Sequence, residues 1–339
     1  MTRLARVVLR VAVVVLLSAA LLEAAVALLL RYPPRTPALR YVARLYYGAF
    51  DRAIIQADPR FARYDPELFY TLRPGRFVYA QREFAHEFRV NRLGVRDEEA
   101  ALDGPEIVVL GDSIAMGWGV AQEDAFPQLL ARESGRRVLN AAVSSYGTVR
   151  QLRLLRRLDT SRLAAVVVQY NANDVGENRL FQQRGVHEGG TREKFEAGAR
   201  KYERGRAYYP GKYAWHAVRW TWRGLGDRIT PPKRRGPDPT ADEEAEAFLN
   251  ALLRAGTVDW ERVRLVVVEA TGEGAPPRMV QALARLRAGR DLPRGIRSAA
   301  LLETGAQLGP DDFHVLDDHP NARGHRRIAD AVLAALRPL

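Results

Sequence analysis

The sequence Ile107-Val108-Val109-Leu110-Gly111-Asp112-Ser113 decides the fold. Four consecutive apolar residues are typical of a strand that is buried on both faces of a parallel sheet. Gly111 permits a sharp turn after this strand, because it has no side chain. Ser113 would then lie at the carboxyl end of the strand, where a helix begins and where an open α/β sheet places its chemistry. On these seven residues alone, Ser113 is explained equally well as an ordinary helix N-cap.

Four further strand patterns follow and alternate with helical patterns. The patterns predict strands at 137–140, 164–170, 263–268 and 297–302, and helices at 114–134, 148–159, 241–255, 276–289 and 321–336. Strands that alternate with helices predict a parallel sheet with helices on both faces. We therefore expect an α/β fold, a flavodoxin-like three-layer α/β/α sandwich with a central parallel sheet of about five strands.

One long apolar segment precedes this domain. Residues 11–30 contain only two polar side chains, Ser18 and Glu23, and about 20 apolar residues suffice to span a bilayer. Three arginines come before the segment: Arg3, Arg6 and Arg10. This charge pattern predicts a cytoplasmic amino terminus and an extracytoplasmic location for the rest of the chain.

A cleaved signal peptide is the alternative explanation of the apolar segment. Ala25-Val26-Ala27 has the small residues of a cleavage site. The apolar run is long for a signal peptide, which favours an uncleaved anchor. Glu23 is costly in lipid, so it would lie near the outer interface, pair with another helix or belong to a cleaved segment.

The chain is expected to have three parts: an anchor at 1–31, a connecting region at 32–103 with a small β ribbon, and the main domain at 104–339. A long insert at 178–240 separates the third and fourth strands. From Arg179 to Gly236 there are 15 Lys or Arg against 5 Asp or Glu, so most of the net charge of +12 lies in one segment. No nucleic-acid-binding motif accompanies this local excess, so we expect no nucleic-acid partner.

The insert also contains Trp215, Trp220 and Trp222 within eight residues. Residues 213–229 could form an amphipathic helix that touches the membrane, with Trp at the interface and Arg near lipid phosphates. They could equally form a lid over the active site. A solvated basic excursion with a local Trp core is a third explanation.

Three polar stretches lie where the predicted strands end or the last helix begins. They are Asn140 to Thr148, Asn171-Ala172-Asn173-Asp174, and Asp317-Asp318-His319. Because the carboxyl ends of parallel strands meet at one edge of a sheet, these stretches should converge on Ser113. The chain contains no Cys, and its His and carboxylates do not cluster at ligand spacing, so we expect no metal and no cofactor.

These stretches together resemble the SGNH hydrolase superfamily, also called GDSL esterases or lipases. Gly111-Asp112-Ser113 matches the first block of the family, and the three polar stretches match the others, so the resemblance covers about 106–336. Tyr64-Asp65-Pro66 and Val90 to Asp97 also resemble segments that precede the catalytic domain in membrane-anchored bacterial members. The resemblance implies the SGNH hydrolase fold and a location at the bacterial cytoplasmic (inner) membrane, single-pass, with the catalytic domain on the periplasmic side.

The resemblance also implies the role of each site residue. Ser113 would be the nucleophile, His319 the general base and Asp317 the acid that orients the imidazole. The oxyanion hole would consist of the backbone N–H groups of Ser113 and Ser145 and the side-chain amide of Asn173.

Two positions of the site differ from the family pattern, and two of the assigned residues have an alternative. The family usually has Gly where this chain has Ser145 and Asn171; Ser can supply the backbone N–H unless the site needs a positive φ. His314 is the rival of His319, because Asp311-Asp312-Phe313-His314 has a D-x-x-H spacing. Asp318 is the weaker alternative to Asp317.

We expect a serine esterase that cleaves a small ester or an acylated glycan through an acyl-enzyme. An O-acetyltransferase or O-acetylesterase acting on cell-envelope glycans is the alternative, since the same triad serves both reactions. A non-catalytic glycan-binding or assembly protein on the same scaffold is the second alternative.

Overall fold

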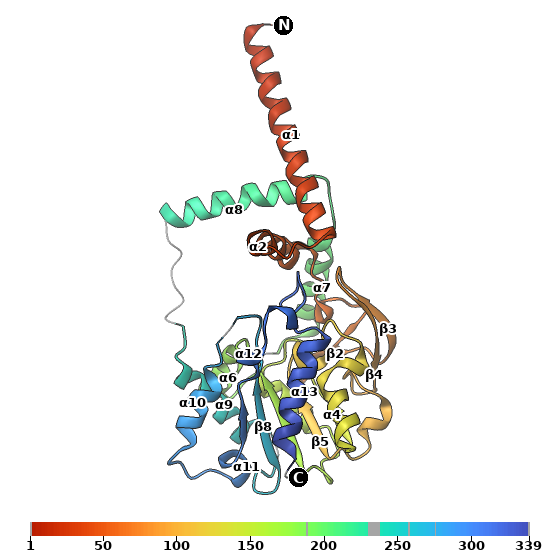
Figure 1. Cartoon of the computed structure of the whole chain (residues 1–339), viewed down its shortest axis with the longest axis vertical. Helices are drawn as coiled ribbons and strands as arrows, with labels where there is room; N and C mark the ends of the chain where they lie inside the picture. The colour runs from red at the N-terminus through yellow and green to blue at the C-terminus, as the bar shows by residue number, and fades with distance from the viewer. Residues whose placement is uncertain (1, 188, 230–237, 257, 275, 338–339) are drawn as a thin grey trace. The chain divides into compact units, whose positions relative to one another are not determined.

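A computed structural model describes residues 2–187, 189–229, 238–256, 258–274 and 276–337 (Figure 1). Positions 188 and 230–237 of the expected insert 178–240 therefore lie outside the described residues. The chain divides into two compact units. The sheet unit comprises Ala53–Tyr202, Pro239–His314 and Asp318–Leu339. The N-terminal unit comprises Met1–Arg52, Glu203–Asp238 and Val315–Asp317.

A parallel sheet of five strands forms the centre of the sheet unit. Its strand order is β6-β5-β7-β8-β9, and each neighbouring pair is parallel. The bounds are Ile107–Leu110 (β5), Val138–Asn140 (β6), Ala165–Tyr170 (β7), Arg264–Glu269 (β8) and Ala300–Leu302 (β9). Every residue of β5 and β7 is buried, as expected for strands covered on both faces.

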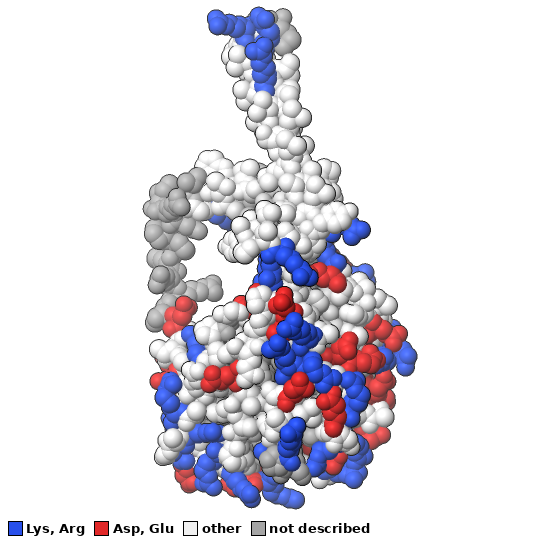
Figure 2. Space-filling model, viewed as in Figure 1, with Lys and Arg blue, Asp and Glu red and all other residues white. Residues whose placement is uncertain are grey.

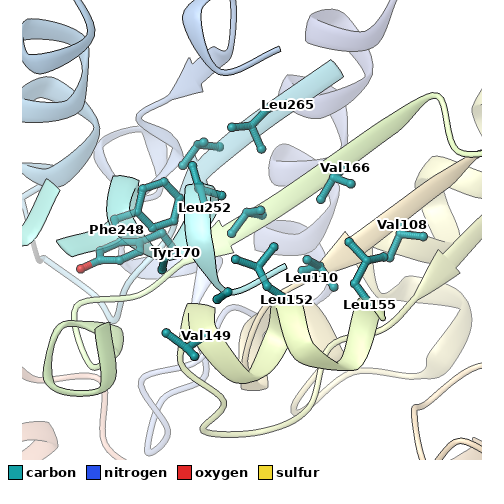
Figure 3. Close-up of a cluster of buried hydrophobic side chains, with 14 of the residues drawn as sticks. Val108, Leu110, Val149, Leu152, Leu155, Val166, Tyr170, Phe248, Leu252 and Leu265 are labelled. Atoms are coloured by element: carbon teal, nitrogen blue, oxygen red, sulfur yellow. The ribbon is translucent and has the colours of Figure 1, made fainter. Parts of the chain in front are cut away.

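Helices cover both faces of this sheet. They are α3 (Ser113–Met116), α4 (Phe126–Ser134), α5 (Thr148–Leu155), α6 (Asp174–Arg184), α9 (Ala241–Arg254), α10 (Met279–Arg287), α11 (Arg294–Arg297), α12 (Thr304–Gln307) and α13 (Ala322–Leu336). Alternate residues of β5 enter two separate cores, since Val108 and Leu110 pack with α5, α9 and α10, whereas Ile107 and Val109 pack with α4 and α13. Figure 3 shows the first core, in which Phe248 and Leu252 of α9 approach the sheet. The three-layer α/β/α fold is therefore confirmed.

One predicted helix, 114–134, is wrong in the structure. It is divided into α3, a 3-10 turn at Gln122–Asp124 and α4. The interruption comes from Gly117 and Gly119, whose φ angles of 86° and 82° are left-handed and end α3. The last predicted strand is also shorter than 297–302, because Arg294–Arg297 forms α11.

Two antiparallel pairs of strands precede the sheet in the same unit. β1 (Ala62–Asp65) pairs with β2 (Phe69–Leu72), and β3 (Gly75–Ala80) pairs with β4 (Ala85–Val90). The second pair forms a small β ribbon within the expected connecting region at 32–103. Phe88 of β4 is fully buried in the core that also contains Val109, so this ribbon packs directly beside the sheet.

The N-terminal unit consists mainly of helices. It contains α1 (Arg3–Arg31), α2 (Pro37–Tyr46), a π-helical turn at Tyr47–Asp51, the end of α7 (Arg192–Arg206) and α8 (Lys212–Ile229). Among the described residues, α1 is the one helix long and apolar enough to cross a membrane, a test that signal sequences also pass. Figure 2 shows cationic side chains at the N-terminal end of α1 and an uncharged surface along the turns that follow.

Candidate active site

Ser113 is the first residue of α3, directly beyond the carboxyl end of β5. Asp112 is the N-cap of α3, and its carboxylate accepts the N–H of Ile114 over 3.1 Å. A side chain at Gly111 would meet Ala115 Cβ at 2.6 Å and Gln169 Oε1 at 2.7 Å. Glycine is therefore required at this position by the close approach of β7 and α3, and not by a left-handed φ.

The hydroxyl of Ser113 lies against the imidazole of His319. Ser113 Oγ and His319 Nε2 are 2.7 Å apart, and both side chains are buried. The indole of Trp118 stacks on the imidazole, with ring centroids 5.2 Å apart and an interplanar angle of 27°. A serine hydroxyl needs an adjacent base to react at neutral pH, and this geometry supplies one.

The two candidate acids differ in their surroundings. Asp318 Oδ1 lies 3.5 Å from His319 Nδ1, and the Asp318 side chain is 55% exposed. Asp317 packs within the N-terminal unit, where its side chain has no exposed surface. There Asp317 Oδ2 accepts the hydroxyl of Tyr47 over 3.0 Å and lies 3.5 Å from Arg52 Nε.

Two asparagines of the third polar stretch converge on Asp112. The amide of Asn171 donates to Asp112 Oδ2 over 2.9 Å, and the amide of Asn173 donates to the same oxygen over 3.2 Å. An amide nitrogen carries two N–H groups, so Asn173 keeps a second donor for a ligand. Asn171, where the family usually has Gly, thus serves to tie this loop to Asp112.

Ser145 has a left-handed backbone, with a φ of 61°. A non-glycine residue in this region carries a cost of about 1–2 kcal/mol. The position therefore does have the positive φ that explains the Gly of the family, and Ser145 adopts it nonetheless. Its exposed hydroxyl accepts the side-chain amide of Gln56 over 2.8 Å.

A buried ion pair supports the loop around Ser145. Arg150 Nε and Glu177 Oε2 are 2.8 Å apart, with 3% and 2% of their side chains exposed. Arg150 Nη2 also donates to the carbonyl of Ser145 over 2.6 Å, and Glu177 accepts the N–H of Gly147 over 3.2 Å. Arg150 and Glu177 thus each form a hydrogen bond to the backbone of this loop. These bonds hold Ser145 in its strained conformation.

Asp174 and Thr148 link the second and third polar stretches. The hydroxyl of Thr148 donates to Asp174 Oδ2 over 2.9 Å. Burial, with a further contribution from the nearby Asp112, raises the pKa of Asp174 well above its ordinary range. Asp112 and Asp174 therefore support the loops.

Arg96 and Asp97 also support the site, in roles that sequence reasoning missed. The fully buried Arg96 guanidinium lies 3.6 Å from the centroid of the Phe88 ring and donates to the carbonyls of Gly117 and Val120, in the loop that carries Trp118. Asp97 Oδ2 accepts the N–H of Asn140 over 2.7 Å. The only sequence signal for these roles was that both residues lie in the motif-like segment from Val90 to Asp97.

The other histidines lie in different surroundings. His314 packs beside the ring of Phe84, 5.5 Å between centroids, and against Gly119. His325 is fully buried in α13, where its Nδ1 accepts the N–H of Phe126 over 3.2 Å. Burial lowers the pKa of His325 to about 3, so it is a neutral packing residue.

Three solved structures are similar to the chain in fold. TesA is 16% identical, with 68% of this chain and 98% of that chain covered and a TM-score of 0.35. A phospholipase A1 from Streptomyces albidoflavus NA297 is 13% identical, with 69% and 99% covered and a TM-score of 0.36. A two-domain esterase active on acetylated mannans is 13% identical, with 71% of this chain and 51% of that chain covered and a TM-score of 0.37.

No curated protein matches the sequence significantly. The sequence model of the GDSL-like lipase/acylhydrolase family, by contrast, matches residues 109–327, well over half of the chain. This range begins within β5 and ends in α13, so it includes Ser113, the polar loops and His319. The chain therefore belongs to the GDSL-like lipase/acylhydrolase family of the SGNH superfamily, and it is an enzyme that hydrolyses ester bonds.

Proposed function

We propose that the chain is a membrane-anchored serine esterase that works outside the cytoplasm and cleaves carboxylic esters through an acyl-enzyme on Ser113. The observation that carries the proposal is the contact of 2.7 Å between Ser113 Oγ and His319 Nε2 at the carboxyl end of β5. The substrate class is a small ester or an acylated glycan.

In the first half-reaction, Ser113 Oγ attacks the carbonyl carbon while His319 Nε2 takes the hydroxyl proton. The displaced electron pair moves to the carbonyl oxygen. The N–H groups of Ser113 and Ser145 and the amide of Asn173 stabilise this oxyanion, and each well-placed donor contributes about 10²–10³ in rate. The tetrahedral intermediate then collapses, and the leaving alcohol takes the proton from His319.

In the second half-reaction, a water molecule attacks the acyl-enzyme. His319 takes a proton from this water and returns it to Ser113 Oγ as the carboxylic acid leaves. The first step consumes the ester and releases the alcohol, and the second regenerates the free serine. No group outside the triad and the oxyanion hole is needed for either step.

Asp317 is the proposed orienting acid. An acid that holds an imidazole in one tautomer is effective when it is buried and fixed, because water screens an exposed carboxylate. Asp317 is fully buried and accepts a hydrogen bond from Tyr47, whereas more than half of the Asp318 side chain is exposed. The contact of 3.5 Å between Asp318 Oδ1 and His319 Nδ1 makes Asp318 the alternative.

The extracytoplasmic location is supported by α1 and its flanking charges. The helix is long and apolar enough to span a bilayer, and Arg3, Arg6 and Arg10 lie in its first third. The positive-inside rule then leaves the catalytic domain on the periplasmic side of the bacterial cytoplasmic membrane.

The proposal is tested with the full chain in detergent micelles and aryl acetate and butyrate as substrates. Wild type should release the aryl alcohol continuously, and Ser113→Ala should be inactive while remaining folded. Ser144→Ala is a matched control that should keep its activity, because it also removes a buried serine hydroxyl, one that has no role in the proposed mechanism. Equal rates for wild type and Ser113→Ala would exclude Ser113 as the nucleophile. Acceleration by an added oligosaccharide, with acyl transfer to its hydroxyls, would replace hydrolysis by O-acyl transfer.

A further inference from the structure

Helix α8 uses one face to pack within the N-terminal unit. Trp220 lies 5.1 Å from Tyr46 and 5.3 Å from Phe50, as measured between ring centroids. His216 stacks on Phe50 at 3.9 Å, and Tyr213 meets Tyr46 edge to face at 5.7 Å. Positions 213, 216 and 220 thus form the packed face, which contacts α2 and the π-helical turn.

The opposite face of α8 is apolar and exposed. Trp215 is 57% exposed, Val218 49% and Trp222 71%, and their spacing places them on one stripe of the helix. Arg219 and Arg223 are also exposed and lie along one edge of this stripe. Large exposed aromatic residues beside arginines are typical of a helix that lies in a membrane–water interface.

The exposed stripe is turned toward the part of α1 that would be in lipid. Within the N-terminal unit, α8 runs crosswise to α1, and α2 lies on the side of α8 that faces away from the amino terminus (Figure 1). Since the packed face of α8 contacts α2, the stripe of Trp215, Val218 and Trp222 faces the amino-terminal turns of α1. A helix that runs crosswise to a membrane span extends along the bilayer surface.

Glu23 fixes the level of α8 on the anchor. Its carboxylate accepts the N–H groups of Tyr213 and Ala214, in the first turn of α8, over 2.9 and 3.1 Å. It also accepts the hydroxyl of Tyr208 over 2.9 Å. The positive end of the α8 dipole thus stabilises the one acidic residue of α1.

The length of α1 before Glu23 is compatible with this boundary. The apolar stretch between Arg10 and Glu23 rises about 20 Å at 1.5 Å per residue. The long side chains of Arg6 and Arg10 can extend to the cytoplasmic interface, so that the lipid-covered part of α1 reaches the hydrocarbon thickness of about 30 Å. Beyond Glu23, Val26 and Leu30 are buried in a protein core with Tyr46 and Tyr47. The last turns of α1 are therefore covered by protein, and the lipid-covered segment ends near Glu23.

We infer that α8 is an interfacial helix that lies on the outer leaflet of the bilayer spanned by α1, with Glu23 marking the boundary of the hydrocarbon core. Trp215 and Trp222 enter the interface, and Arg219 and Arg223 bind lipid phosphates. The N-terminal unit is thereby held at a fixed depth in the bilayer by both α1 and α8. This inference rests on the proposed membrane span of α1.

The test uses the full chain in liposomes of zwitterionic and anionic phospholipids. Because the chain has no Cys, single cysteines introduced as Trp222→Cys, Thr221→Cys and Val14→Cys can each carry a nitroxide label. Electron paramagnetic resonance then compares the collision rates of each label with oxygen, which partitions into lipid, and with a water-soluble nickel complex. The ratio at position 222 should be several-fold higher than at position 221, which lies off the apolar stripe, and should stay below that at position 14, which lies deeper in the hydrocarbon core.

The outcomes separate the two proposals. A lipid-like ratio at position 14 with a water-like ratio at position 222 would overturn the interfacial role of α8 and leave the anchor intact. Water-like ratios at both positions would overturn the anchor itself. Because Trp222 is 71% exposed, its replacement should not disturb folding, which circular dichroism of each variant checks.

Discussion

The hydroxyl of Tyr47 donates a hydrogen bond of 3.0 Å to Asp317 Oδ2, across 270 positions of the sequence. Tyr47 begins the π-helical turn that follows α2, and Arg40 and Arg44 of α2 donate to the carbonyl of Val315 in the same loop. The loop that carries the proposed catalytic acid is therefore held by the segment that follows α1.

Tyr47→Phe should slow the reaction without changing substrate binding. The substitution removes one hydrogen bond to a carboxylate, which is worth about 1.5–3 kcal/mol. We expect kcat to fall by about 10-fold or more and KM to change little, since Tyr47 positions Asp317 and does not touch the substrate. Tyr41→Phe is the matched control, because Tyr41 of α2 is 64% exposed. Equal effects of both variants would mean that the bond to Asp317 has no role in catalysis.

Asp317→Asn should lower kcat by about 10³–10⁴-fold, because an amide stabilises the wrong imidazole tautomer and cannot stabilise the imidazolium. Asp318→Asn should stay within about 10-fold of wild type, since its carboxylate is largely solvated. Steady-state kinetics on an aryl acetate compare the two variants directly. The reverse order of the two effects would transfer the orienting role to Asp318.

Ser145→Gly should keep most of the activity, because the proposed donor is the backbone N–H and glycine adopts the φ of 61° without strain. Glycine removes the strain of a positive φ, but it also has more conformational freedom in the unfolded chain. Because these two effects oppose each other, stability should change by less than about 1 kcal/mol. Ser145→Val should lose both stability and activity, because a β-branched residue strongly disfavours this backbone conformation. Activity and thermal unfolding of both variants are the measurements. An active Ser145→Val with an inactive Ser145→Gly would show that the loop needs another feature of this residue.

Ionisation of Asp97 should lower the free energy of unfolding as the pH rises. Burial raises the pKa of Asp97 from its ordinary value of 3.8 to about 6, so the folded state favours the protonated acid. The contribution of Asp97 to stability is then fully present below about pH 4 and is lost as the pH rises through about 6. This loss amounts to at most about 3 kcal/mol. Denaturant unfolding of wild type and Asp97→Asn between pH 4 and 7 isolates this contribution as a difference. The free energy of unfolding of Asp97→Asn minus that of wild type should increase with pH. A difference that stays constant with pH would contradict the raised pKa of Asp97.

The sheet followed directly from the sequence, as did the positions of Ser113 and Asn173 after strands and of His319 before the last helix. Buried parallel strands consist of continuous apolar runs, and each of the polar blocks follows such a run or precedes a helix. The helix at 114–134 was wrong because its apolar periodicity continues across Gly117 and Gly119, although their left-handed conformation interrupts the backbone.

The choice between Asp317 and Asp318 was beyond the sequence for a different reason. The two residues are adjacent, so only tertiary partners distinguish them, and Tyr47 carries no signal that links it to position 317. The role of Glu23 was hidden in the same way, because the N–H groups it accepts are about 190 positions away. Both contacts depend on the packing of segments that are distant in the sequence. Local sequence patterns carry no information about such packing.

Trapping of the acyl-enzyme shows directly whether Ser113 is the nucleophile. The full chain is mixed rapidly with an activated aryl ester and quenched with acid before the acyl-enzyme turns over, and its peptides are analysed by mass spectrometry. We expect a stoichiometric burst of aryl alcohol and one acylated peptide modified at Ser113, both absent in Ser113→Ala. Acylation of another residue, or steady hydrolysis by Ser113→Ala, would contradict it.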